Sequence, residues 1–324
     1  MYPLKFEDIL RPMIWGGEEI SRFKQLPEVH PGIGESWEIS QVGDRISVVC
    51  EGEDKGKTIT ELIKRDGANL LGKHVAARYA DKFPLLIKFI DAHDNLSIQV
   101  HPNDELAMAR HNSFGKTEMW YVIDAKPGAG LYSGFSKQIT PAEYVERIKN
   151  NTITDVLQFH EAKSGDVFFL PAGRIHAICE GILIAEIQQS SDITYRIYDY
   201  DRRDAQGNAR ELHIEQSIDA VDFKMYDNLR TDYAAKNNDA VGLVKCPYFE
   251  TNLIEVDKSV KRSVSGHDSF VIYMCMGGKV RLTDNNGYTI SLHQGQTALI
   301  PATLSWVTIE AETSAKLLEC YIPE

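Results

Sequence analysis

The sequence contains an internal repeat, and this repeat limits the folds that the chain can adopt. The segment GDVFFLPAGRIH, from Gly165, and the segment GQTALIPATLSW, from Gly295, each have a proline after five intervening residues and match at a separation of 130 residues. A second match pairs TEMWYVIDAKPG, from Thr117, with SFVIYMCMGG, from Ser269, at a separation of 152 residues. The 22-residue difference between these separations predicts an insertion inside the first copy. Two related units are therefore expected, because self-similarity along a chain reflects a repeated structural unit.

The pattern of side chains predicts a mainly β protein. Many short segments alternate apolar and polar residues and are separated by glycine, proline or asparagine, which is typical of antiparallel strands in a sandwich or barrel. Helices are predicted at the capping box Thr58-x-x-Glu61, after the N-cap and proline of Thr140-Pro141, and after His213.

Residues 224–240 are polar and contain few large apolar side chains, so they are predicted to link two domains. The first domain would span residues 1–223 with helical insertions at about 140–160 and 211–223, and the second would span 241–324.

Composition excludes several classes of partner. The formal net charge is −12 and no run of lysine and arginine is present, so binding to nucleic acid or an anionic membrane is not expected. No stretch approaches the roughly 18 apolar residues of a membrane span, and the N-terminus has no apolar signal-peptide core. The five cysteines are scattered without a CxxC pair, which argues against disulfides and favours a cytoplasmic location. The sequence leaves monomer and homodimer open.

Four potential metal ligands come from three segments of the first copy. In LSIQVH, the two-residue period of a strand puts Gln99 and His101 on one face. Glu118 lies in a second predicted strand, and His176 follows the glycine-rich turn. Two imidazoles, a carboxylate and an amide oxygen suit one zinc ion with room for substrate. For Gln99 a hydrogen bond to a neighbouring strand is the alternative.

In the second copy, Phe270 and Trp306 occupy the positions of Glu118 and His176. The second unit is therefore expected to bind no metal and to be filled with apolar side chains.

Several segments resemble a known family. GDVFFLPAGRIH matches the second motif of the cupins, and the wider set is similar to type I mannose-6-phosphate isomerases (phosphomannose isomerases) in their short bacterial form. The matching segments are Ile14–Gly16, Gly34–Glu38, Phe83–Lys88, Leu96–Pro102, Lys116–Met119 and Ser191–Arg196. The resemblance covers most of the chain. It departs in lacking a large helical domain and in having Asn103 where aspartate is usual.

The resemblance implies two cupin (jelly-roll) barrels with catalysis in the first. It implies a zinc-dependent isomerase that interconverts mannose 6-phosphate and fructose 6-phosphate, a sugar phosphate being the partner. The residues matching Gln99, His101, Glu118 and His176 would bind zinc, and Arg196 would be an active-site residue. Near the substrate phosphate, the resemblance places Lys88, Arg202 and Ser97. For Lys88 and Arg202 a surface salt bridge is the alternative.

Aldose–ketose isomerisation needs a group that moves a proton between two adjacent carbons. Lys116 shares a face with Glu118, and a nearby dication together with burial would lower its pKa, so Lys116 is the predicted proton carrier. An ion pair with Glu118 is the alternative for Lys116, and Asp192 or zinc-bound water could carry the proton instead.

Arg196 is predicted to reach the same pocket, since Asp192, Thr194 and Arg196 alternate along one stretch. Its permanent charge suits phosphate or enediolate oxygens, and a pair with Asp199 or Asp201 is the alternative. Trp15 and Trp37 could stack on a sugar or pack in the core.

Two other functions remain open from the sequence. A cupin that binds sugar without catalysis would need an output module, and no helix-turn-helix region or basic recognition surface is evident. A metal-dependent oxygenase also uses two histidines and a carboxylate. The predicted Gln99 ligand and the cations available for phosphate argue against it.

Overall fold

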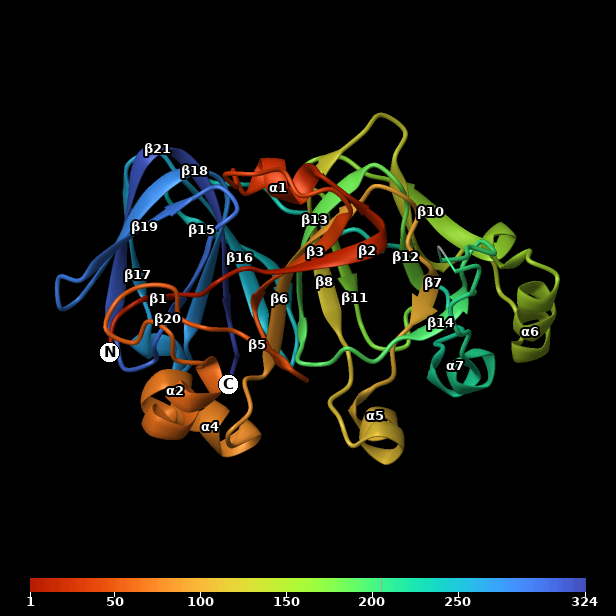
Figure 1. The fold of residues 1–324 in the computed structure, drawn as a ribbon, viewed down its shortest axis with the longest axis horizontal. Helices are drawn as coiled ribbons and strands as arrows, with labels where there is room; N and C mark the ends of the chain where they lie inside the picture. The colour runs from red at the N-terminus through yellow and green to blue at the C-terminus, as the bar shows by residue number, and fades with distance from the viewer. Residues whose placement is uncertain (205) are drawn as a thin grey trace.

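The computed structural model describes residues 1–204 and 206–324 and consists mainly of antiparallel strands. Figure 1 shows two strand-rich halves side by side, with β2 to β14 in one half and β1 with β15 to β21 in the other. The mainly β prediction is confirmed, while the division into two closed barrels stays a prediction. None of the helices in these residues has the length and apolar character needed to span a bilayer.

The first half contains two large sheets. The six-stranded sheet has the order β11 (Val167–Leu170), β8 (Glu118–Ala125), β13 (Ile182–Gln189), β6 (Leu85–Ala92), β3 (Ile33–Ile39) and β2 (Ile9–Gly17). The five-stranded sheet has the order β10 (Leu157–Glu161), β9 (Gly130–Phe135), β12 (His176–Ile178), β7 (Ile98–Val100) and β14 (Tyr195–Tyr198). A short hairpin joins β4 (Gln41–Val42) and β5 (Arg45–Ile46).

The central strands β6 and β13 of the six-stranded sheet are buried at every position, which explains why they are mostly apolar. In β6, Ile87 and Phe89 belong to a core that also contains Phe270 and Leu318 of the second half. On the opposite face, Ile90 packs with side chains of the five-stranded sheet. One face therefore holds the halves together, and the other faces the interior of the first half.

The second half is built on one eight-stranded sheet. Its main path is β1 (Leu4–Lys5), β20 (Thr297–Ile300), β18 (Val271–Asp284), β21 (Trp306–Tyr321), β16 (Glu250–Val256) and β15 (Ala240–Lys245). Two further strands pair off this path, β17 (Ser259–Ser263) with β21 and β19 (Thr289–His293) with β18. The N-terminal strand β1 thus belongs to the sheet of the second half, with Leu4 opposite Leu299. The domain boundary at residues 224–240 stays a prediction, and Thr231 in that segment donates to the Val167 carbonyl at 2.8 Å.

A buried ionic cluster also joins the halves. The Lys24 ammonium donates to both Glu38 carboxylate oxygens at 2.8 Å and to the Gly295 carbonyl of the second half at 2.6 Å. Asp8 lies 3.0 Å from the same ammonium. Since the Lys24 and Glu38 side chains are only 2% exposed, water does not screen the pair.

The three helices predicted from capping signals are present. Thr58 caps α2 (Ile59–Asp66) in a complete capping box, Thr140 caps α6 (Pro141–Lys149), and α7 (Ile214–Ala220) follows His213. The remaining helices are α1 (Glu19–Phe23), α3 (Ala68–Leu71), α4 (Lys73–Tyr79), α5 (Asp104–His111) and the 3-10 turns η1 (Ile153–Val156) and η2 (Ser265–His267). Asn103 is the N-cap of α5, since its side-chain oxygen accepts from the Leu106 amide at 2.9 Å, so it fills the capping role that an aspartate would also serve.

Two details differ from the sequence predictions. Residues 157–161 of the predicted helical insertion form strand β10 instead, because they pair with β9. Trp306 was expected to fill the second unit, but it is partly exposed and Lys261 Nζ lies 3.7 Å from its ring centroid. Phe270 is buried, yet it packs on Phe83 of the first half, with ring centroids 4.9 Å apart. Phe270 therefore packs at the junction of the two halves, and Trp306 lies at the surface of the second half.

Candidate active site

The five-stranded sheet places three functional side chains in one row. Gln99 in β7 is the register partner of His176 in β12 and of Arg196 in β14. Because paired residues on neighbouring strands project to the same face, the amide stands between the imidazole and the guanidinium. The two-residue period of LSIQVH thus brings Gln99 to the expected face.

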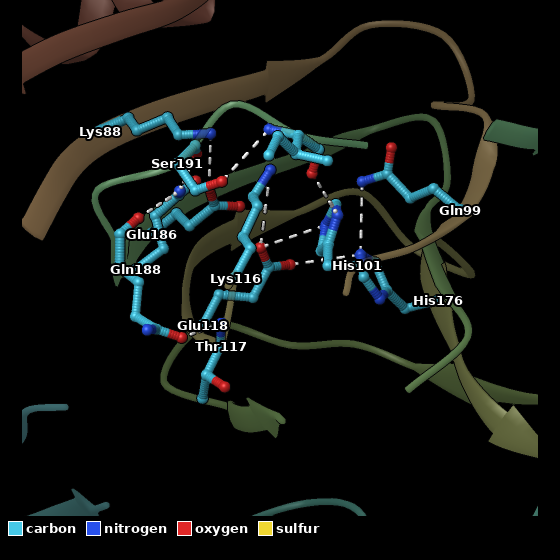
Figure 2. A network of polar contacts seen from close by, with 12 residues as sticks. Lys88, Gln99, His101, Lys116, Thr117, Glu118, His176, Glu186, Gln188 and Ser191 are labelled. Carbon is cyan, nitrogen blue, oxygen red and sulfur yellow. Dashed lines mark hydrogen bonds and ion pairs between the residues drawn. The ribbon is translucent and has the colours of Figure 1, made fainter. Parts of the chain in front are cut away.

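His101, Glu118 and His176 form a compact buried group. Their ligand atoms lie within 4.8 Å of one another, although they come from β7–α5, β8 and β12. His176 Nε2 lies 3.3 Å from Glu118 Oε1, and His101 Nε2 lies 3.5 Å from Glu118 Oε2. Figure 2 shows both rings on one side of the Glu118 carboxylate, with one contact from the carboxylate to each ring. The structure therefore brings together the three residues that the sequence predicted as metal ligands.

Backbone carbonyls orient both imidazoles. His101 Nδ1 lies 3.0 Å from the Ile193 carbonyl, and His176 Nδ1 lies 2.8 Å from the Arg174 carbonyl. Each Nδ1 therefore carries the proton, and the Nε2 lone pair faces Glu118. Burial lowers the pKa of His101 well below its usual value and lowers that of His176 to about 4. Both rings are thus neutral, as metal ligands must be.

The unsatisfied atoms of this group fit a bound cation. His101 Nε2 and both carboxylate oxygens of Glu118 are buried and make no hydrogen bond within the described part of the chain. Burial, and then the nearby Glu186, raise the pKa of Glu118 to about 8. Three buried acceptors without donors are costly, and a metal ion at their centre would satisfy all of them.

Gln99 lies at the edge of this group. Its Nε2 is 3.3 Å from His176 Nε2, so the amide nitrogen faces the ring. Rotating the amide would direct its oxygen there instead. Ligation by Gln99 stays a prediction.

A second polar network adjoins the metal group and contains a residue that the sequence reasoning missed. Lys88 Nζ lies 2.6 Å from Glu186 Oε1, and the Trp120 indole donates to Glu186 Oε2 at 2.8 Å. The register explains this network, because Glu186 in β13 is opposite Lys88 in β6 and Trp120 in β8. The sequence did contain a signal for this residue, because Glu186 is the single carboxylate in the mostly apolar run ILIAEIQQ and a buried acid is rare without a partner.

Lys116 lies on the side of this network that faces the metal group. Its Nζ is 3.9 Å from Glu118 Oε2, and the residue is only 6% exposed. Burial, and then the charge of Lys88, lower the pKa of Lys116. For Lys88, burial is the largest effect and acts in the same direction, but the charges of Glu186 and Glu35 and the hydrogen bond to Glu186 together outweigh it and raise the pKa.

Lys88, Lys116 and Glu186 line a cavity of about 280 Å³ between the two sheets, whereas His101, Glu118 and His176 are not among its lining residues. Seven of the predicted site residues line it: Trp15, Lys88, Ser97, Gln99, Lys116, Asp192 and Arg196. Arg202 is not among the lining residues. Four charged residues that the sequence reasoning did not assign also line the cavity: Arg11, Glu35, Glu186 and Arg210. The alternation Asp192, Thr194, Arg196 predicted a shared face, and all three residues reach the cavity.

Comparison with known proteins gives one consistent result. Residues 4–128 match the model of the phosphomannose isomerase type I catalytic domain, and residues 240–318 match that of the mannose-6-phosphate isomerase cupin domain. The chain is 34% identical to mannose-6-phosphate isomerase ManA of Bacillus subtilis over 313 residues, which cover 95% of this chain and 96% of that protein. It is also 34% identical to the mannose-6-phosphate isomerase of Streptococcus mutans over 306 residues, which cover 94% of each chain.

Solved structures agree with this result. A crystal structure of the mannose 6-phosphate isomerase from Bacillus subtilis superposes with a TM-score of 0.89 and 29% identity, covering 99% of this chain and 100% of that one. The resemblance inferred from the sequence motifs is therefore confirmed along almost the whole length. The chain belongs to the type I phosphomannose isomerase family.

Proposed function

We propose that this protein is a zinc-dependent aldose–ketose isomerase that interconverts mannose 6-phosphate and fructose 6-phosphate through an enediol(ate). The observation that carries the proposal is the convergence of His101, Glu118 and His176 beside the cavity between the two sheets. The names of the two curated relatives support the choice of substrate. The five cysteines are free, which supports a reducing cytoplasm as the location.

One zinc ion per chain would be held by the two neutral imidazoles and the Glu118 carboxylate, with the Gln99 amide oxygen as the fourth protein ligand. Zinc suits this set because it accepts nitrogen and oxygen ligands and tolerates an open position. When bound, the ion would supply a positive charge that stabilises the negative charge developing on the substrate oxygens at C1 and C2.

The proton transfer is assigned to Lys116. A neutral Lys116 amine would take the proton from C2 of the open-chain aldose and return it to C1 of the enediol(ate). Its position supports this role, because Nζ lines the cavity beside the metal group while its neighbour Lys88 is held by Glu186. Asp192 also lines the cavity, but it is exposed to solvent and is the second candidate.

The walls of the cavity would bind the sugar. Trp15 and Trp37 line it and are 3% and 1% exposed, so both also pack in the protein interior. Arg196 would face enediolate or phosphate oxygens, and Ser97 offers a hydroxyl on the same side.

A coupled assay tests this function. Zinc-loaded protein should convert mannose 6-phosphate to fructose 6-phosphate, chelation should abolish turnover, and added zinc should restore it. Elemental analysis should find one zinc per chain in the wild type and a large loss in Glu118→Gln, since that change removes the anionic ligand. If zinc-loaded wild type does not isomerise mannose 6-phosphate, the assignment fails, and oxygen consumption would point to an oxygenase instead.

A further inference from the structure

Most cations that line the cavity are matched by one carboxylate each. Arg11 donates to Glu35 at 3.1 Å, and Lys88 lies 2.6 Å from Glu186. Lys116 lies 3.9 Å from Glu118. Arg11 and Lys88 are therefore balanced before any substrate enters, and Lys116 adds no lasting charge if it is the neutral base of the proposed function.

The arginines around Asp199 are different, because three guanidinium groups gather near one carboxylate. Arg210 donates from Nε to Asp199 Oδ2 at 2.8 Å and from Nη2 to Oδ1 at 2.5 Å. Arg202 also donates to Asp199 Oδ1, at 2.5 Å. Burial lowers the pKa of Arg196, and the nearby charges of Arg210 and Arg202 lower it further. Three guanidinium groups therefore share one buried carboxylate, since the other carboxylate near Arg196, that of Glu211, is 81% exposed, and the cluster carries an excess of positive charge.

Within this cluster, Arg196 and Arg210 line the cavity and Arg202 does not. All three nitrogens of the Arg202 guanidinium are occupied, by the Asn95 carbonyl and by the backbone and side chain of Asp199. Arg196 Nε, in contrast, is buried and has no hydrogen-bond partner among the described residues. Buried donors without acceptors are rare in native proteins, so the arginine face of the cavity fits an anion.

We propose that Arg210, together with Arg196, binds the phosphate of the substrate, and that Asp199 is a positioning residue that fixes the Arg210 guanidinium. The inference rests on the proposed function and names the residues that select a phosphorylated sugar. A phosphate monoester carries a charge of about −1.5 to −2 near pH 7, which is opposite in sign to the excess of the cluster. Arginine forks bind such groups with paired hydrogen bonds.

The register of the sheet agrees with this placement. His176, Gln99 and Arg196 stand on three neighbouring strands in that order. Two strand spacings put Arg196 roughly 10 Å from His176 along the sheet. The phosphate on C6 and the reacting carbons C1 and C2 lie at opposite ends of the substrate, so one end would reach the arginines while the other reaches the metal group.

Kinetics of Arg210→Gln test the assignment, with Arg203→Gln as the matched control. Arg203 lies in the same loop, but its side chain is 57% exposed and pairs with Asp201. Loss of a charge-assisted contact should raise KM for mannose 6-phosphate roughly 10- to 100-fold, with a much smaller change in kcat. The inhibition constant of inorganic phosphate should rise in parallel, and Arg210→Lys should recover part of both. Arg203→Gln should match the wild type.

Two outcomes would overturn the inference. One is an unchanged KM and an unchanged phosphate inhibition constant in folded Arg210→Gln. The other is a large rise in both in Arg202→Gln with none in Arg210→Gln, because the phosphate would then lie at Arg202. Both outcomes require a wild type that isomerises mannose 6-phosphate. If the wild type does not, the proposed function fails, and calorimetry with inorganic phosphate on the wild type and Arg210→Gln still reports on the anion site.

Discussion

Lys88 and Lys116 lie in one buried network, yet their surroundings shift their pKa values in opposite directions. Glu186 makes a close pair with Lys88 and raises its pKa, whereas burial and the charge of Lys88 lower the pKa of Lys116. The two residues differ because Glu186 is the register partner of Lys88. The network therefore favours the protonated form of Lys88 and disfavours that of Lys116.

Replacing Lys116 with methionine separates proton transfer from metal binding. We expect Lys116→Met to keep the metal and the fold but to lower kcat by about 10²- to 10⁴-fold, because a general base contributes on that scale. Lys116→Arg should not restore turnover, since a guanidinium stays protonated. Steady-state kinetics and metal content check this, and Lys149→Met on the exposed end of α6 is the control. Full activity in Lys116→Met would move the role to another group.

The sequence predicted side chains whose positions depend on local periodicity. Gln99, Glu118 and Arg196 reach the expected face because alternation along a strand is a local property. Glu186 and Arg210 were not assigned, because their roles depend on partners in other segments. Glu186 meets Lys88, 98 residues earlier, and Arg210 meets Asp199 across a loop. A single sequence contains no information on such pairings.

Secondary-structure elements likewise divide into those that local sequence predicts and those that depend on distant partners. The capping signals of α2 and α6 involve residues three apart, and both helices begin where those signals predicted. Strand β10 was assigned to a helical insertion, because its identity depends on pairing with β9. Local signals therefore located helix starts, whereas strand partners required the folded molecule.

The capping box of α2 gives a stability test. Thr58 Oγ1 accepts from the Glu61 amide at 3.2 Å, and Glu61 Oε2 accepts from the Thr58 amide at 2.8 Å. Thr58→Ala should therefore lower the free energy of unfolding by about 1 kcal/mol, and Thr58→Ser should restore most of it. Urea denaturation measures both variants. Equal midpoints for Thr58→Ala and the wild type would mean that the box does not stabilise the helix.

At the scale of the whole molecule, one apolar core and one ionic cluster join the halves. Residues from both halves share the core around Phe83 and Phe270, and Lys24 links Glu38 to the Gly295 carbonyl. The repeat predicted two related units, but it did not indicate that β1 completes the sheet of the second unit. A strand of two residues is too short to show a period.

Removing Lys24 should weaken this junction in a pH-dependent way. Lys24→Met leaves Glu38 buried without its cation, which should cost about 3–5 kcal/mol. Burial already raises the pKa of Glu38 to about 7, above its usual value, so the folded state binds this proton more tightly than the unfolded state. The cost should therefore be smaller near pH 5, where Glu38 is protonated, and should grow as pH rises through 7.

Urea titrations at pH 5 and pH 8 measure this effect. The double variant Lys24→Met with Glu38→Gln is the control and should be more stable than Lys24→Met alone at pH 8, because its buried unpaired carboxylate has been removed and the remaining Asp8 is 30% exposed. If Lys24→Met lowered the free energy of unfolding equally at pH 5 and pH 8, the unpaired carboxylate of Glu38 would not be the cause.

The pairing of β1 with β20 also has a consequence for synthesis on the ribosome. Leu4 is translated almost 300 residues before its partner Leu299. The segment of β1 must therefore wait, unpaired, while the intervening polypeptide is made, and this edge of the sheet can form only after β20 has been translated. Until then the backbone groups of β1 are unpaired and can pair with another nascent chain.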